Sequence, residues 1–188
     1  MPLDIVILGP PGAGKGTQAE RIVVETGLPH INTGDLLRAE IQAGTELGRN
    51  VEAILARGDL VSDDIVIELV RKRLQEPDTG EGFVLEGFPR TLAQAEALDA
   101  MLDELDRELS VVLHFQLPED IALERLRLRG RNDDNPETIR HRMNVQRVPD
   151  DVIEYYRTRG ILVGIHADRS VDEVFAEVQD VLETAAAR

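Results

Sequence analysis

An apolar run, Leu3-Asp4-Ile5-Val6-Ile7-Leu8, passes directly into a glycine-rich stretch, Gly9-Pro10-Pro11-Gly12-Ala13-Gly14-Lys15-Gly16-Thr17. The run is too short for a helix and rich in β-branched residues, so it predicts a buried strand. The glycines would let successive backbone N–H groups point inward at a helix start, and Lys15 would add a full positive charge. This is the pattern of a phosphate-binding loop as far as Gly14-Lys15, although Gly16 replaces the usual Ser or Thr. A glycine-rich turn with an incidental lysine is the alternative.

The rest of the chain alternates between short apolar runs and helical patterns. Buried strands are predicted at 28–31, 83–85, 111–115 and 161–165. Apolar residues recur at helical spacing over 92–105 and 171–182, and Ser170-x-x-Glu173 is typical of a capping box. Alternating strands and helices predict an α/β fold in which a parallel sheet has helices on both faces. No repeat, low-complexity tract or linker interrupts the pattern, so one domain over 1–188 is expected.

Composition argues against several classes of protein. The 188 residues carry 21 Lys+Arg against 36 Asp+Glu, and the net charge of −15 would repel a nucleic-acid backbone. No apolar run approaches the roughly 20 residues that span a bilayer, and no basic stretch opens the chain as in a signal peptide. The chain has no Cys, which excludes disulfides and thiolate-bound zinc. We expect a cytoplasmic protein with no nucleic-acid and no membrane partner.

Positive charge is concentrated in one part of this acidic chain. Seven arginines lie within 23 residues: Arg125, Arg127, Arg129, Arg131, Arg140, Arg142 and Arg147. A guanidinium group is a planar, permanently charged fork that matches phosphate oxygens. The cluster therefore favours a small polyanion as the ligand, and a solvated helix face is the alternative.

Several separate motifs, in one order along the chain, resemble those of the nucleoside monophosphate kinases, and of the adenylate kinase branch in particular. Beside Gly-Lys-Gly-Thr at 14–17, they are Thr33-Gly34-Asp35-Leu36-Leu37-Arg38, Gly58-Asp59-Leu60-Val61, Gly87-Phe88-Pro89-Arg90, Gly130-Arg131-Asn132-Asp133-Asp134 and Ile139–Arg142. The resemblance covers nearly the whole chain. It implies a three-layer P-loop NTPase fold with a five-stranded parallel core at 1–31, 62–127 and 135–188. It also implies a mobile helical AMP-binding segment at 32–61 and a very short lid at about 128–134.

The resemblance also assigns roles to particular residues. It implies that ATP binds at Gly12, Ala13, Gly14, Lys15, Gly16, Thr17, Arg129 and Arg169. AMP would bind at Thr33, Arg38, Asp59, Leu60, Val61, Gly87, Phe88, Pro89, Arg90, Gln94, Arg131 and Arg142. The catalytic cations would be Lys15, Arg90, Arg129, Arg131 and Arg142. Phosphoryl transfer needs in-line positioning, neutralised charge and exclusion of water, which such cations and a closing lid would supply.

The identity of the acceptor base depends on two residues. Thr33 and Gln94 match family positions that contact adenine, whereas uridylate and cytidylate kinases carry Ala and Asn there. Each also has a structural alternative. Thr33 could cap the helix that follows it, and Gln94 could complete a capping box with Thr91. The pair together favours AMP.

The chain departs from the family at several positions. Glu86 replaces the usual Asp before Gly87, where a carboxylate should order Mg²⁺ through its waters. Arg169 replaces a Gly that lets the backbone touch the donor's adenine, which implies looser donor selectivity. The lid has no cysteine for zinc. No role is assigned to the scattered histidines His30, His114, His141 and His166, which share no ligand spacing.

These observations predict a magnesium-dependent kinase that converts ATP and AMP reversibly to two ADP. A monomer is expected, as is common in the family. A pyrimidine monophosphate kinase is the alternative within the same class. A nucleotide-binding regulatory module that has lost turnover is the alternative from another class, and Glu86 keeps it open.

Overall fold

Short runs of buried, mostly aliphatic residues form a central five-stranded sheet in the computed structural model, which describes residues 2–129 and 136–187. The strands are β1 (Leu3–Leu8), β2 (His30–Asn32), β3 (Gly82–Glu86), β4 (Val111–Gln116) and β5 (Leu162–His166). Their order is β2-β3-β1-β4-β5, and every neighbouring pair is parallel. The predicted α/β fold is therefore confirmed, although β2 begins two residues later than expected.

Helices connect the strands, because parallel neighbours cannot be joined by a tight turn. They are α1 (Lys15–Thr26), α2 (Thr33–Gln42), α3 (Glu46–Arg57), α4 (Asp63–Leu74), α5 (Leu92–Asp103), α6 (Glu119–Arg129), α7 (Pro136–Val145), α8 (Asp150–Thr158) and α9 (Val171–Ala186), with a 3₁₀ helix, η1 (Pro77–Thr79), before β3. The predicted capping box at Ser170 and Glu173 forms and starts α9. No helix in the described part of the chain is long and apolar enough to cross a bilayer.

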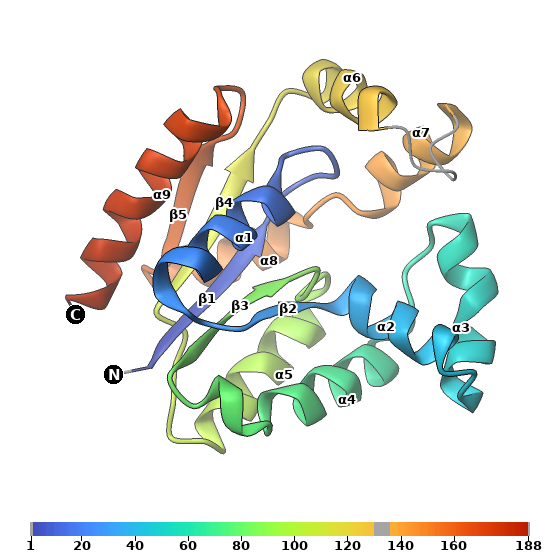
Figure 1. The fold of residues 1–188 in the computed structure, drawn as a ribbon, viewed down its shortest axis with the longest axis horizontal. Helices are drawn as coiled ribbons and strands as arrows, with labels where there is room; N and C mark the ends of the chain where they lie inside the picture. The colour runs from blue at the N-terminus through green and yellow to red at the C-terminus, as the bar shows by residue number, and fades with distance from the viewer. Residues whose placement is uncertain (1, 130–135, 188) are drawn as a thin grey trace.

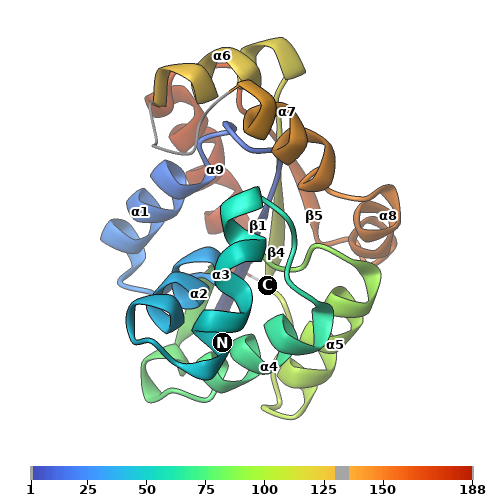
Figure 2. The ribbon, with the colours of Figure 1, turned by 90° about the vertical axis from the view of Figure 1, so that its right-hand side faces the viewer.

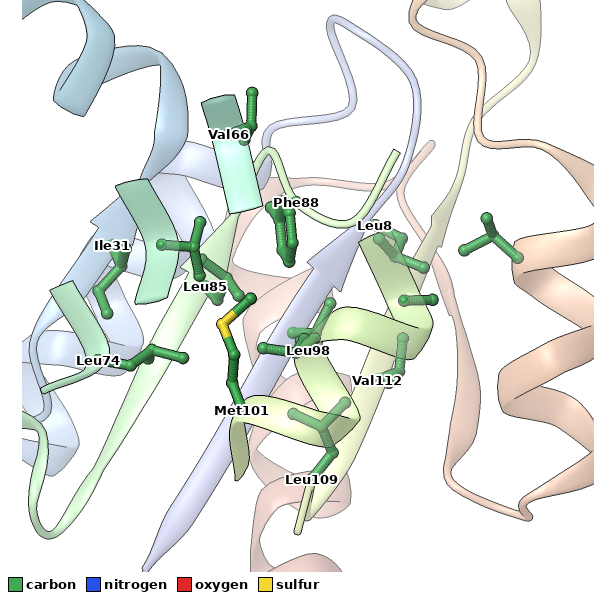
Figure 3. Packing of buried hydrophobic residues seen from close by; sticks show 14 of the residues in the cluster. Leu8, Ile31, Val66, Leu74, Leu85, Phe88, Leu98, Met101, Leu109 and Val112 are labelled. Atoms are coloured by element: carbon green, nitrogen blue, oxygen red, sulfur yellow. The ribbon is translucent and has the colours of Figure 1, made fainter. Parts of the chain in front are cut away.

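The two faces of the sheet bury separate hydrophobic clusters, which makes the three layers. Ile5 and Ile7 of β1 pack on the side of α1 and α9, whereas Val6 and Leu8 pack on the side of α4, α5 and α8. This alternation follows from the two-residue period of a strand. Figure 3 shows the second cluster, in which Leu98 of α5 lies near the centre.

Helices α2, α3, α6 and α7 extend beyond the end of the sheet where the strands finish (Figure 1). In Figure 2, α6 and α7 lie above this end, and α2 and α3 lie below it. The carboxyl ends of β1 and β3 lie side by side at this end of the sheet. Ligands of open parallel sheets bind in this location.

Candidate active site

A cavity of ≈ 860 Å³ opens at the carboxyl end of the sheet. Its walls come from the loop after β1, from α2 and α3, from the residues after β3, and from α6 and α7. The predicted site residues that line it are Gly12, Gly14, Lys15, Gly16, Thr17, Thr33, Arg38, Asp59, Leu60, Val61, Glu86, Gly87, Arg90, Gln94 and Arg142. The volume is that of a site for a small organic ligand. Segments far apart in the chain thus meet at one place.

The glycine-rich loop presents the start of α1 to this cavity. Gly12 has a φ of +83°, and a Cβ there would lie 2.8 Å from the carbonyl oxygen of Ala122, so only glycine fits between the loop and α6. The N-cap of α1 is Gly14, which has no side chain to occupy the first N–H groups of the helix. Lys15 Nζ donates to the carbonyl oxygen of Pro10 at 2.9 Å, so the side chain folds back over the loop. Helix N–H groups and an ammonium at one point form an anion-binding site.

Glu86, at the end of β3, faces this loop. A Cβ placed on Gly16 would lie 3.7 Å from Glu86 Oε2, and His30 Nε2 donates to the same oxygen at 3.1 Å. Burial by itself would raise the pKa of Glu86. The hydrogen bond from His30, the charge of Lys15, the charge of His30 and a hydrogen bond from Asn32 together hold that pKa below its ordinary value. The side chain is therefore kept as a carboxylate beside the loop.

His30 was missed by the sequence reasoning, which assigned no role to any histidine. It lines the cavity at the start of β2, and it reaches Glu86 because β2 pairs with β3 in register. Histidines were judged by metal-ligand spacing along the chain, and that test cannot detect a partner on a neighbouring strand.

Arg90 follows β3 and lines the cavity. Its Nε donates to the carbonyl oxygen of Gly87 at 2.9 Å, and burial lowers the pKa of its guanidinium, partly opposed by the charge of Glu86. Among residues 2–129 and 136–187, no carboxylate lies within ion-pair distance of Arg90. A buried cation without a protein counter-ion is costly. Arg90 is thus placed to receive an anion from outside the chain.

Helix α7 reaches the cavity through its contact with the end of α3. Gly58 has a φ of +78°, and a Cβ there would lie 2.9 Å from Arg142 Cγ, so the stem of Arg142 packs directly on the backbone. His141 Nε2 and Asp59 Oδ1 are 2.6 Å apart, and Gln146 Nε2 donates to the carbonyl oxygen of Gly58 at 3.2 Å. Hydrogen bonds from His141 and Arg57 lower the pKa of Asp59. His141 is the second histidine whose contact the sequence did not reveal.

Arg38 lines the cavity from α2. Its Nη2 is 2.5 Å from Asp35 Oδ1, one helical turn away, and the side chain is half exposed. The helix begins at Thr33, and Asn32 caps it by accepting from the backbone N–H groups of Gly34 and Asp35 at 2.9 and 3.3 Å. Thr33 is therefore not the cap of α2. Its side chain is buried at the cavity wall instead.

Gln94 does not complete a capping box. Thr91 Oγ1 does accept from Gln94 N at 3.2 Å, as that motif requires. The reciprocal bond is absent, because Gln94 Oε1 accepts from Arg90 N at 2.7 Å instead. The amide Nε2 donates to Asp63 Oδ1 at 2.8 Å. Both ends of the Gln94 side chain are thus held at the cavity wall by residues other than Thr91.

A family model described as adenylate kinase matches residues 7–161. The chain belongs to the adenylate kinase family. It is 49% identical to an adenylate kinase of Synechococcus sp. (strain RCC307) over 179 residues, which cover 95% of this chain and 97% of the relative. It is 47% identical to an adenylate kinase of Corynebacterium urealyticum, covering 92% of this chain and 94% of the relative. As a member of this family, the protein is a phosphotransferase of the nucleoside monophosphate kinase group.

Another adenylate kinase relative, from Archaeoglobus fulgidus, is 38% identical over 213 aligned positions, covering 96% of this chain and 98% of the relative. Because this chain has only 188 residues, at least 25 of those positions have no counterpart here. The family therefore includes longer and shorter chains, and this protein is one of the shorter members.

Some predicted residues of the family site do not line the cavity. Ala13 and Phe88 are buried in the two hydrophobic clusters, and Pro89 follows a cis peptide bond and is buried too. The guanidinium of Arg169 pairs with Glu177 away from the cavity. Arg131, the side chain of Arg129 and most of the predicted lid lie outside the described residues.

Arg125 was not among the predicted site residues, although it belongs to the arginine cluster. It lines the cavity from α6, and its Nη1 donates to the carbonyl oxygen of Ala167 at 2.8 Å. Clustering was the signal that could have found it, but clustering alone does not separate Arg125 from its neighbours on the same helix.

Proposed function

We propose that the protein transfers the γ-phosphoryl group of MgATP reversibly to AMP and so forms two ADP. The observation that carries this proposal is Arg90, a partly buried guanidinium with no carboxylate partner in the described chain, in the same cavity as the phosphate-binding loop. One cavity thus offers two separate positions for phosphate. A kinase that transfers a phosphoryl group from one nucleotide to another requires two such positions.

The donor and the acceptor would bind on opposite sides of the cavity. The phosphates of ATP would lie on the loop from Gly12 to Thr17, with the ammonium of Lys15 on the β and γ groups. The phosphate of AMP would lie against Arg90 and Arg38. Arg142 reaches the cavity from α7. We propose that Arg142, with Arg129 and Arg131, neutralises the charge that develops on the transferring phosphoryl group.

The helical segment at 32–61, which contains α2 and α3, would hold AMP, and residues 128–134 would form the short lid. Closing both over the nucleotides would exclude water, which otherwise competes as the acceptor. Thr33, Leu60, Val61 and Gln94 line the wall where the acceptor base would lie. We also propose that the protein acts as a monomer in the cytoplasm.

Magnesium would enter with ATP. In the described chain, no group of three or more His, Cys, Asp or Glu side chains could hold a metal ion by itself. The residues present do fit an ion that keeps several waters and takes its other oxygens from the nucleotide. Glu86 is the carboxylate that faces the loop, so it would orient those waters. Bound in this way, Mg²⁺ would neutralise charge on the β and γ phosphates.

The test is to incubate the purified protein with MgATP and, in parallel, with AMP, CMP or UMP, and to measure formation of the two diphosphates. We expect AMP to be by far the best acceptor. A preference for CMP or UMP would replace AMP by a pyrimidine nucleotide in this proposal. Nucleotide binding without any diphosphate formation would make the protein a regulatory nucleotide-binding module.

A further inference from the structure

Asp63, the first residue of α4, holds the side chain of Gln94. Asp63 Oδ1 accepts from Gln94 Nε2 at 2.8 Å, and Asp63 Oδ2 accepts from Thr91 Oγ1 at 2.8 Å. On the other side of the same amide, Gln94 Oε1 accepts from Arg90 N at 2.7 Å. Asp63 itself does not line the cavity, whereas Gln94 does. Its hydrogen bond to Gln94 therefore gives Asp63 an indirect link to a ligand in the cavity.

These contacts select one of the two orientations of the amide. A backbone N–H can only donate and a carboxylate can only accept, so the amide oxygen must face Arg90 and the amide nitrogen must face Asp63. Rotating the amide by half a turn would set nitrogen against the N–H of Arg90 and oxygen against the carboxylate. Two hydrogen bonds would become two repulsive contacts. The orientation is thus determined by the chain before any ligand binds.

The oriented amide still has one N–H and one oxygen lone pair for a ligand. The edge of a 6-amino purine carries an N–H donor at position 6 beside an acceptor at N1. A 6-oxo purine carries the same two functions in the reverse order, an acceptor at position 6 beside an N1–H donor. An amide that could turn freely would match either edge. An amide with a set orientation matches only one of them when the base lies in a given position.

We infer that Asp63 is a positioning residue that sets the preference of the acceptor site for a 6-amino purine over a 6-oxo purine. This inference rests on the proposed function, because it requires the acceptor base to lie against Gln94. Thr91 supports the arrangement, since its hydroxyl fixes the second oxygen of Asp63 and also accepts from the backbone of Gln94. A site built to satisfy one hydrogen-bonding pattern rejects the analogue that leaves its groups unpaired.

The test compares AMP with IMP, which differ at position 6 and in the proton on N1. Binding of each to the wild-type protein and to Asp63→Ala is measured by calorimetry, together with kcat/KM for each as the acceptor. We expect the wild-type protein to favour AMP, and we expect Asp63→Ala to reduce the AMP-to-IMP ratio about tenfold or more. A purely structural role would weaken both nucleotides alike and would leave this ratio unchanged.

Asp64→Ala is the matched control. Asp64 is the next residue in the same first turn of α4, and it is exposed and bonded to Ser62 rather than to Gln94. Its replacement should leave the ratio at the wild-type value. Asp63→Asn should retain most of the discrimination, because its amide oxygen can still accept from Gln94 while its nitrogen donates to Thr91.

If Asp63→Ala does not fold, Thr91→Val makes the same test, since it removes the hydroxyl that fixes Asp63. We then expect a smaller fall in the ratio, about threefold. An unchanged ratio in the folded variant would overturn the inference. Equal binding of AMP and IMP by the wild-type protein would overturn it too but would leave the proposed function intact. A wild-type protein that uses no monophosphate as an acceptor would overturn both.

Discussion

Each end of the parallel sheet carries a partly buried arginine, Arg107 where the strands begin and Arg90 where they finish. Arg107 donates from Nε to Asp4 Oδ2 at 2.9 Å and from Nη2 to Asp4 Oδ1, and it donates from Nη1 to the carbonyl oxygen of Thr79 at 2.8 Å. Its guanidinium also lies 5.4 Å from the ring centroid of Phe83. Arg90 has one such contact, with the carbonyl oxygen of Gly87, and no carboxylate partner in the described chain.

Arg107 is a charge that stabilises the fold, whereas Arg90 is a charge that is available to a ligand. Asp4 is fully buried and the side chain of Arg107 is 9% exposed, so this pair is satisfied inside the protein. Arg90 is packed against the protein on one side only, because its other side faces the cavity. Removing a paired charge should therefore cost stability, whereas removing a cavity charge should cost activity.

The largest effect is expected from Lys15→Ala. Loss of the ammonium that we propose to bind the donor phosphates should reduce kcat on the order of 10³-fold, while the free energy of unfolding stays close to that of the wild type. Lys72 is the chain's other lysine, 72% exposed and 3.5 Å from Glu68, and Lys72→Ala is the control. Steady-state rates of ADP formation for the two variants make the measurement. Wild-type turnover in Lys15→Ala would remove the donor site.

At the opposite end of the sheet, Asp4→Ala should act on stability. It leaves Arg107 buried without its carboxylate, and we expect a loss of about 3–5 kcal/mol in the free energy of unfolding. Urea titration measures this loss, and the rate per folded molecule should remain that of the wild type. A stable but inactive variant would show that the two ends of the sheet are not independent.

Arg90→Ala should have the reverse signature. Loss of the charge-assisted contact that we propose with the acceptor phosphate should lower kcat/KM for AMP about 10²-fold. The free energy of unfolding should not decrease, because a buried cation without a counter-ion is removed. The control is Arg71→Ala. Arg71 Nη1 donates to Glu104 Oε2 at 2.5 Å, and neither residue lines the cavity. A large loss of stability in Arg90→Ala would contradict the comparison.

The smallest effect concerns an ion pair near Arg107 that is not buried. Arg73 donates to both oxygens of Asp78 at 2.8 and 2.7 Å, and these bonds lower the pKa of Asp78 below its ordinary 3.8. The stabilisation is present above that value and is lost as the pH falls through the lower pKa of the folded state. Because water screens the pair, Arg73→Gln should cost only about 0.5 kcal/mol at pH 7.

The measurement is urea unfolding of the wild type and Arg73→Gln at pH 7 and at several values below 3.8. The difference in the free energy of unfolding between the two proteins should become smaller as the pH falls. A difference that widens in acid would mean that Asp78 is not stabilised by Arg73. Comparison with Asp4→Ala then shows how much burial changes the contribution of an ion pair to the free energy of unfolding.

Much of the fold could be predicted because its signals are local. Apolar runs indicated every strand, and the capping residues of α9 marked where it begins. The strand at 28–31 was displaced, since β2 comprises only three residues and its position follows from pairing with β3. Short edge strands contain too few residues for periodicity to place them.

Prediction was less complete for the site. The loop from Gly12 to Thr17 could be recognised because its spacing is contiguous. A capping box with Thr91 was the structural alternative for Gln94, yet its oxygen bonds to the N–H of Arg90 and its nitrogen to Asp63. Asp63 was not expected to take part at all. Its partners are 28 and 31 positions away, and local patterns carry no information at such separations.

From its sequence alone, this protein was determined to be an α/β protein with a phosphate-binding loop after its first strand, because turn chemistry and side-chain periodicity act between near neighbours. The tertiary structure decided which of its charges are neutralised inside the chain and which face the cavity. It also decided the partners of His30 and Gln94. Coulombic and hydrogen-bonding partners depend on distance in space, and that distance depends on the order of the strands within the sheet.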